Sequence, residues 1–93
     1  MKTIWKYELD TVDNQLIEMP LSARILTVQT QNEKPCLWCL TYPNIPKEVW
    51  KKREIIIHGT GHDVEAVPGE YIGTYQLLNG ALVYHVFDKG FKI

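Results

Sequence analysis

The chain has 93 residues, 45% of them hydrophobic, and its ten basic and eleven acidic side chains leave a formal net charge of −1. This length predicts one domain spanning residues 1–93, because domains mostly hold about 50–200 residues. The charge balance offers no broad basic field, so nucleic acid is not an expected partner. No apolar run approaches the length of ~20 residues that is needed to cross a bilayer, and the residues after Met1 do not have the pattern of a signal peptide. Two cysteines in such a chain fit reduced thiols. We therefore expect a cytoplasmic protein with no membrane partner.

The first half of the chain alternates apolar and polar residues as β-strands do. Four strands are expected here, at residues 3–9, 15–19, 23–31 and 36–42. In the first, Trp5, Tyr7 and Leu9 share a face, because successive side chains of a strand point to opposite sides. The polar residues 32–34 predict a hairpin between the third and fourth strands, with a loop longer than the common two-residue type.

Residues 43–53 interrupt this pattern and predict a crossing loop. Pro43 and Pro46 have no amide hydrogen to donate and disfavour helix before them. Pro46 nevertheless suits the first position of a single helical turn. In that arrangement Val49 and Trp50 are expected to pack back onto a sheet.

The second half of the chain ends in the clearest hairpin. Three further strands are expected, at residues 53–58, 70–77 and 82–87. Asn79-Gly80 is a strong hairpin signal, because both central residues of a type I′ turn need positive φ. Residues 88–93 are expected to form a tail. Together these elements predict an all-β fold, a small antiparallel β-sandwich or barrel of about seven short strands with a proline-containing crossing loop.

Two motifs together resemble the halves of a zinc site: Cys36-x2-Cys39 and His58-x3-His62. An offset of three residues places the two thiols on opposite faces of a strand, and the two residues between them form a poor turn. We therefore expect no metal and no cofactor, and we interpret the thiols as small buried hydrophobic groups.

The sequence shows neither a nucleophile elbow nor a paired-carboxylate spacing. Cys39 and His85 form the one cysteine–histidine pair to examine in space. We interpret His85 instead as a core or interface residue that is hydrogen-bonded to a neighbour. No catalytic residue is assigned, and the protein is not expected to be an enzyme.

The segment after the isoleucine-rich strand has two interpretations. One is a β-bulge or bend, in which glycine supplies positive φ. The other is an anion-binding or nucleotide-binding turn, in which successive backbone N–H groups face a phosphate and the histidines add donors. The segment matches neither the P-loop nor G-x-G-x-x-G. The candidate ligand-binding residues are His58, Gly59, Thr60, Gly61 and His62.

Aromatic side chains are more numerous than a small core can hide. Tyrosine and tryptophan give a large contact area at little entropic cost and are enriched at interfaces. They predict an interaction surface for a homo-oligomer, a protein partner or a stacked base, with partial burial over the core as the alternative. Its candidate residues are Trp5, Trp38, Trp50, Tyr71, Tyr75 and Tyr84.

The chain as a whole resembles a family of short bacteriophage and prophage proteins known only as a domain of unknown function. Its most distinctive parts are IHGTGH at residues 57–62 and EYIGTYQLLNGALVYHVF at residues 70–87. The resemblance brings no activity and no catalytic residues. It implies a phage gene product that acts in the bacterial host cytoplasm.

This setting favours a non-enzymatic accessory protein that acts by binding. The leading expectation is inhibition of a bacterial anti-phage defence component. Inhibition would work either by contact with a host defence protein, for example through an edge strand, or by sequestering a nucleotide-like immune signal. The alternative is a structural or assembly accessory protein of the phage. A small hydrolytic or metal-dependent enzyme comes third.

Overall fold

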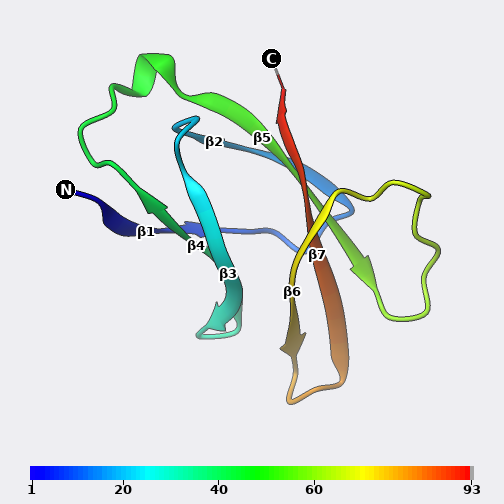
Figure 1. Ribbon diagram of the computed structural model, residues 1–93. Helices are drawn as coiled ribbons and strands as arrows, with labels where there is room; N and C mark the ends of the chain where they lie inside the picture. Colours follow the sequence, from blue (N-terminus) through cyan, green and yellow to red (C-terminus); the bar gives the residue numbers. More distant parts are fainter. Residues whose placement is uncertain (93) are drawn as a thin grey trace.

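The computed structural model describes residues 1–92, which form seven β-strands and one short 3-10 turn, η1 (Lys47–Val49) (Figure 1). The strands are β1 (Thr3–Glu8), β2 (Asn14–Met19), β3 (Arg24–Gln31), β4 (Lys34–Thr41), β5 (Lys51–Gly59), β6 (Glu70–Leu77) and β7 (Leu82–Lys92). The predicted all-β fold of about seven short strands with a proline-containing crossing loop is confirmed. Over these 92 residues, no helix has the length and apolar character needed to span a membrane.

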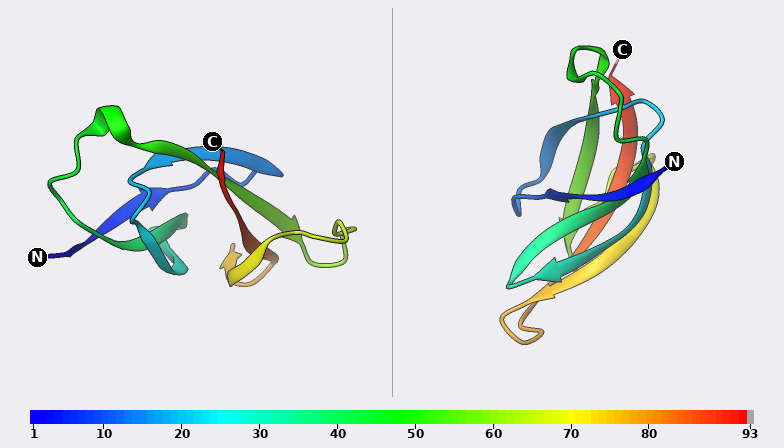
Figure 2. Two further views of the ribbon diagram at one scale, coloured as in Figure 1. Left: turned by 45° about the horizontal axis from the view of Figure 1, so that its top comes forward. Right: turned by 90° about the vertical axis from the view of Figure 1, so that its left-hand side faces the viewer.

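The strands form two antiparallel sheets. The first has the order β1-β4-β3 and the second the order β2-β5-β7-β6. Consecutive strands β1 and β2 therefore belong to different sheets. Figure 2 shows β3 and β6 side by side, where an edge of one sheet meets an edge of the other.

The core lies between the inward faces of both sheets. Its buried members are Leu9, Val28, Leu37, Cys39, Ile55, Ile57, Tyr75 and Val86. In β1 the predicted alternation is confirmed, since Trp5 and Tyr7 turn inward while Ile4 and Lys6 are exposed. The central strand β5 loses this alternation, because residues 54–57 are all buried.

The expected tail is wrong. β7 continues to Lys92 and pairs with β5, with Phe91 opposite Arg53. The register between the two strands shifts near residue 89, and Gly90 takes a φ of 92°, so the strand bends and continues. Residue 93, the end of the predicted tail, lies outside the described residues. β5 also begins at Lys51, two residues before the predicted start.

Both hairpin turns differ from the predictions. β3 and β4 join through only Asn32 and Glu33, whose φ values of 52° and 63° are those of a two-residue type I′ turn. The β6–β7 turn starts one residue earlier than Asn79-Gly80. Leu78 has a φ of 52°, and the Gly80 amide donates to the Leu77 carbonyl at 3.2 Å.

The crossing loop is held by tryptophan packing. The Trp50 ring lies against Trp5, with centroids 5.7 Å apart, and its Nε1 donates to the Ile45 carbonyl at 3.1 Å. The prediction is therefore correct for Trp50. It is wrong for Val49, which is 54% exposed, because η1 lasts a single turn and directs this side chain outward.

Leu78→Asn should raise the free energy of unfolding by about 1 kcal/mol, because asparagine tolerates positive φ better than leucine does. Leu78 is 63% exposed, so little apolar packing is lost. The urea midpoint, at an unchanged m-value, measures the gain. Leu82→Asn in the adjoining strand is the matched control and should destabilise. Equal losses in both variants would contradict the strained turn.

Candidate functional site

The HGTGH segment forms a bend, as one of its two interpretations predicts. Gly59 ends β5, and Gly61 takes a φ of 87°. The His62 amide donates to the Gly59 carbonyl at 3.1 Å, and the Thr60 amide donates to the Val83 carbonyl at 3.1 Å. The His62 ring lies so close to Gly59 that a Cβ there would meet it at 2.8 Å.

These hydrogen bonds bear on the predicted anion-binding turn. An anion nest needs successive backbone N–H groups that are free to face the ligand. Here the amides of Thr60 and His62 already donate to carbonyls, which removes the row of free donors. Anion or nucleotide binding at residues 58–62 stays a prediction, and this backbone geometry weighs against it.

His85 anchors a polar chain on the outer face of the second sheet. Its Nε2 lies 2.7 Å from the Thr60 hydroxyl, and its Nδ1 lies 2.9 Å from the Thr74 hydroxyl. Thr74 in turn contacts the Tyr71 hydroxyl at 2.6 Å. The interpretation of His85 is confirmed for its hydrogen bonds, but its placement in the core is wrong, because the ring lies on the outer face, and an interface role stays a prediction. Cys39 lies in the core instead, so the structure does not bring the suggested cysteine–histidine pair together.

His58 lies on the same outer face as its cross-strand partner His85 and packs on Phe87. Its ring meets the Phe87 ring edge-on, with centroids 6.0 Å apart. Its Nε2 is buried and has no hydrogen-bond partner within residues 1–92. His58 and His62 thus lie at the end of the second sheet, whereas Cys36 and Cys39 belong to β4 of the first. Within residues 1–92, no three His, Cys, Asp or Glu side chains lie close enough together to hold a metal ion.

Burial governs the chemistry of the core's ionisable groups. Desolvation raises the pKa of the Cys39 thiol to about 11, and it raises the pKa of Tyr7 to about 12. Cys36 is fully buried as well. Since the thiolate is the reactive form, the raised pKa makes Cys39 unreactive at neutral pH, whereas Cys36 is shielded by its burial.

The six predicted surface aromatics do not form one surface. Trp5 and Trp50 pack on each other, and Trp38 is half-buried on the opposite face of the first sheet. Tyr75 is only 3% exposed and stacks with Tyr84 at 5.5 Å. Tyr71 is exposed on β6, which leaves it as the one predicted aromatic that is open to a partner. Strand alternation divides the six residues among different faces, and several are partly buried, as the alternative interpretation has it; a role of these residues in an interaction stays a prediction.

Within the described residues, the edge strands β3 and β6 of the two sheets lie side by side, and we call the line along which they meet the seam. The sequence did not predict this feature. Near its start, residues 23–26 face residues 70–72; farther along, residues 29–30 face residues 74–76. The two strands therefore run in the same direction. No ladder hydrogen bonds join them within residues 1–92, since they are edges of separate sheets.

The seam is held at three places along its length. At its midpoint Val28 packs so closely on Gly73 that a Cβ there would meet the Val28 side chain at 3.0 Å. At its far end the Glu33 carboxylate accepts a hydrogen bond from the Leu78 amide at 3.0 Å. Each strand also has a register shift near the start of the seam, at Leu26 in β3 and Ile72 in β6. The strands splay there because a bulge bends its strand away from the regular ladder.

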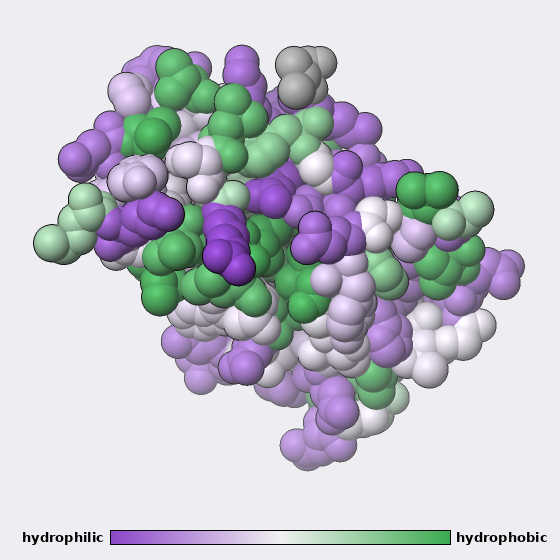
Figure 3. Space-filling model, viewed as in Figure 1, coloured by the Kyte–Doolittle hydropathy of each residue, from purple (hydrophilic) through white to green (hydrophobic). Residues whose placement is uncertain are grey.

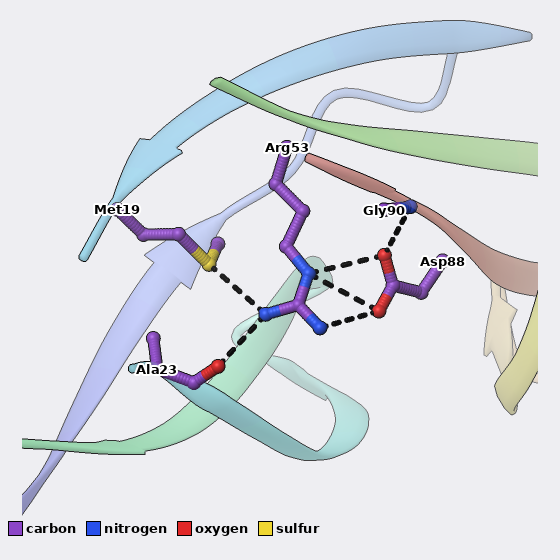
Figure 4. Close-up of polar contacts among 5 residues, drawn as sticks. All are labelled: Met19, Ala23, Arg53, Asp88 and Gly90. Atoms are coloured by element: carbon purple, nitrogen blue, oxygen red, sulfur yellow. Dashed lines mark hydrogen bonds and ion pairs between the residues drawn. The ribbon is translucent and has the colours of Figure 1, made fainter. Parts of the chain in front are cut away.

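The third contact, at the start of the seam, is a buried ion pair (Figure 4). The Arg53 guanidinium binds Asp88 through Nε at 3.1 Å and through Nη2 at 2.6 Å. Its Nη1 donates to the Ala23 carbonyl at 2.8 Å, and the Gly90 amide donates to Asp88 at 2.9 Å. The two side chains are only 14% and 11% exposed. This cluster joins β5 and β7 to the start of the first sheet.

Two grooves open along the seam, one on each side of the Val28–Gly73 contact. The first has a volume of about 320 Å³ and is lined by Ala23, Arg24, Ile25, Leu26, Arg53, Glu70, Tyr71, Ile72 and Asp88. The second has a volume of about 440 Å³, and the surface of both grooves is mostly polar. Figure 3 shows apolar and strongly hydrophilic side chains directly beside one another over the region of β3 and β7.

A family model described as "Domain of unknown function (DUF7352)" matches residues 1–92. Neither the curated proteins nor the solved structures give a match.

Replacing either member of the ion pair should cost about 3–5 kcal/mol of stability, because the remaining charge is left buried and unpaired. Arg53→Met combined with Asp88→Asn should cost less than the sum of the two single changes. Urea unfolding of the double-mutant cycle measures this coupling. Lys34→Met, which breaks an exposed pair with Asp10, is the control and should change stability by less than about 1 kcal/mol. Additive losses for Arg53 and Asp88 would show that the pair does not act as a unit.

Cys36 and Cys39 should resist a thiol-labelling reagent in the folded protein and react fully in urea. Burial excludes the reagent from both, and the raised pKa of Cys39 suppresses its thiolate. Mass spectrometry of the labelled protein counts the modified thiols. Val64→Cys, at an exposed loop position, is the positive control and should react at once. Prompt native labelling of Cys39 would contradict the described core.

Proposed function

This chain belongs to the DUF7352 family, whose function is unknown, and we propose from its geometry that it acts by binding an extended segment of another protein rather than by catalysis. The observation behind this proposal is the seam, where two edge strands face each other without hydrogen bonds between them. Edge strands present unpaired N–H and C=O groups, which an added strand can satisfy.

The first groove suits such a segment better than the second. Its walls are the unpaired edges of β3 and β6, splayed at Leu26 and Ile72. Its volume of about 320 Å³ lies at the small end of the range typical of ligand sites. Three residues of β3 line it, which corresponds to about 10 Å of extended chain. We expect it to hold three or four residues, roughly that length, of an extended segment.

Side chains around this groove would select the segment. Leu26 and Ile72 provide apolar contact, while Arg24 and Glu70 provide charges of opposite sign. Arg53 and Asp88 are already paired with each other, so they shape the groove rather than offer a free charge. The expected ligand is an extended segment with an apolar residue flanked by charged ones. Backbone pairing supplies its affinity and the charges supply its register.

For the cellular role, we propose inhibition of a bacterial anti-phage defence component by contact with a host protein. The support for this role is the resemblance of the chain to small phage proteins. The seam is compatible with it, since a docked segment would be kept from its normal partners. Sequestration of a nucleotide-like signal is less favoured, because the HGTGH amides are already engaged.

A photo-cross-linking residue placed at Leu26 should capture one discrete protein in bacterial cells. The same residue at Val67, an exposed loop position away from the groove, is the control and should not capture it. A peptide covering the cross-linked segment should then bind the purified protein. Arg24→Glu should weaken that binding about tenfold, and Lys47→Glu should leave it unchanged. Capture at Val67 alone, or peptide binding unaffected by Arg24→Glu, would remove the seam from the proposal.

The cellular role has its own test. The protein, expressed in strains that each carry one defence system, should restore phage plating in one of them, and Arg24→Glu should abolish the rescue. Recovery of the protein in purified phage particles, without rescue, would favour the assembly role instead. A nucleotide-sized mass on the native protein that disappears on denaturation would favour signal sequestration.

A further inference from the structure

β1 is a free edge on the side of the first sheet opposite the seam. It pairs with β4 from Thr3 opposite Thr41 to Glu8 opposite Cys36. Within residues 1–92 no strand pairs with its other side, so alternate N–H and C=O groups there lack ladder partners. Two strands of the sheet separate this edge from the seam, so a partner at β1 leaves the grooves open.

The outer face beside this edge carries apolar side chains. Ile4 is 57% exposed and lies opposite Leu40, while the neighbouring pair is Lys6 and Trp38. Charged residues usually protect an edge strand from pairing, and Lys6 and Glu8 serve that purpose against most partners. A partner strand whose charges have the complementary order would be attracted by these same residues, so that they would select it as a partner.

A second copy of residues 2–8, which are β1 and the residue before it, has that order of charges in one register. Residues opposite each other in an antiparallel pair lie on the same face, so inward residues must meet inward residues. A two-fold axis at Trp5 satisfies this rule: it places Lys2 opposite Glu8 twice and Ile4 opposite Lys6. An axis at Lys6 would oppose two lysines, and an axis at Ile4 would oppose Lys2 and Lys6. An axis at Tyr7 would overlap only the last three residues of the strand.

We infer that two copies of this chain associate through antiparallel pairing of β1 about an axis at Trp5. The result is a continuous six-stranded sheet with the order β3-β4-β1-β1-β4-β3. The pairing supplies partners for the unpaired backbone groups of both edges, and two Lys2–Glu8 ion pairs fix its register. It also brings the Ile4 side chains of both copies into the middle of one outer face, which reduces their exposure. This inference is independent of the seam and of the proposed function.

A charge reversal tests this register. Sedimentation velocity over a concentration series should show a monomer–dimer equilibrium for the native protein. Lys2→Glu and Glu8→Lys should each weaken the dimer about tenfold or more, because each creates two like-charge pairs. The double variant should return to within about threefold of the native affinity. Lys51→Glu, which makes the same charge change on β5, is the control and should not alter the dimer. Circular dichroism confirms that each variant is folded.

Cysteine cross-linking gives a second test that does not depend on affinity. Ile4→Cys and Lys6→Cys place thiols opposite each other across the two copies, at the Cα separation a disulfide needs. An equimolar mixture should form a covalent heterodimer on mild oxidation, and each variant alone should form far less. A native protein that stays monomeric at every concentration overturns the inference. So does a dimer that ignores both charge reversals and gives no heterodimer.

Discussion

The ion pair between Arg53 and Asp88 is the interaction on which the arrangement of the two sheets depends. Two charges that are almost fully removed from water cost several kcal/mol unless each is satisfied by partners. Here the guanidinium binds the carboxylate with two nitrogens and the Ala23 carbonyl with the third, and the carboxylate also accepts the Gly90 amide. These geometries hold only if β5, β7 and the start of β3 keep their relative positions. The pair therefore fixes where the first sheet meets the second.

The seam follows from this fixed meeting point. β3 and β6 are brought together in the same direction, yet their register shifts and the Val28–Gly73 contact prevent a regular ladder. The fold thus keeps two edges near each other without closing into a barrel. An unpaired seam of this kind lowers the stability of a small protein, since the backbone N–H and C=O groups along it are hydrogen-bonded to water instead of to another strand. The two grooves and the charged side chains around them lie along this seam, where the strands β3 and β6 are not paired with each other.

The local sequence pattern predicted most of the strands, because the alternation of apolar and polar residues and the turn-forming residues depend only on neighbouring positions. It failed where distant segments decide the outcome. The tail became part of β7 because β5 offers it a partner, and six aromatic residues were divided among faces that no local pattern reveals. The partners Arg53 and Asp88 are 35 residues apart, so their pairing depends on the sheet register. One signal was available for the seam: an isolated glycine within a strand, such as Gly73, is typical of a bulge or a close backbone approach.

The assignment of β1 and β2 to different sheets has a consequence for biosynthesis. β1 must wait for residues 36–41 before it has a partner, and β2 must wait for residues 51–56. Residues 1–20 therefore leave the ribosome before either of their two strands has a partner to pair with. Non-local strand pairing is slow, and unpaired strands invite aggregation during that delay. The polar outer positions of β1 and β2, including Lys6 and Glu18, then act as solubilising groups before they belong to any surface.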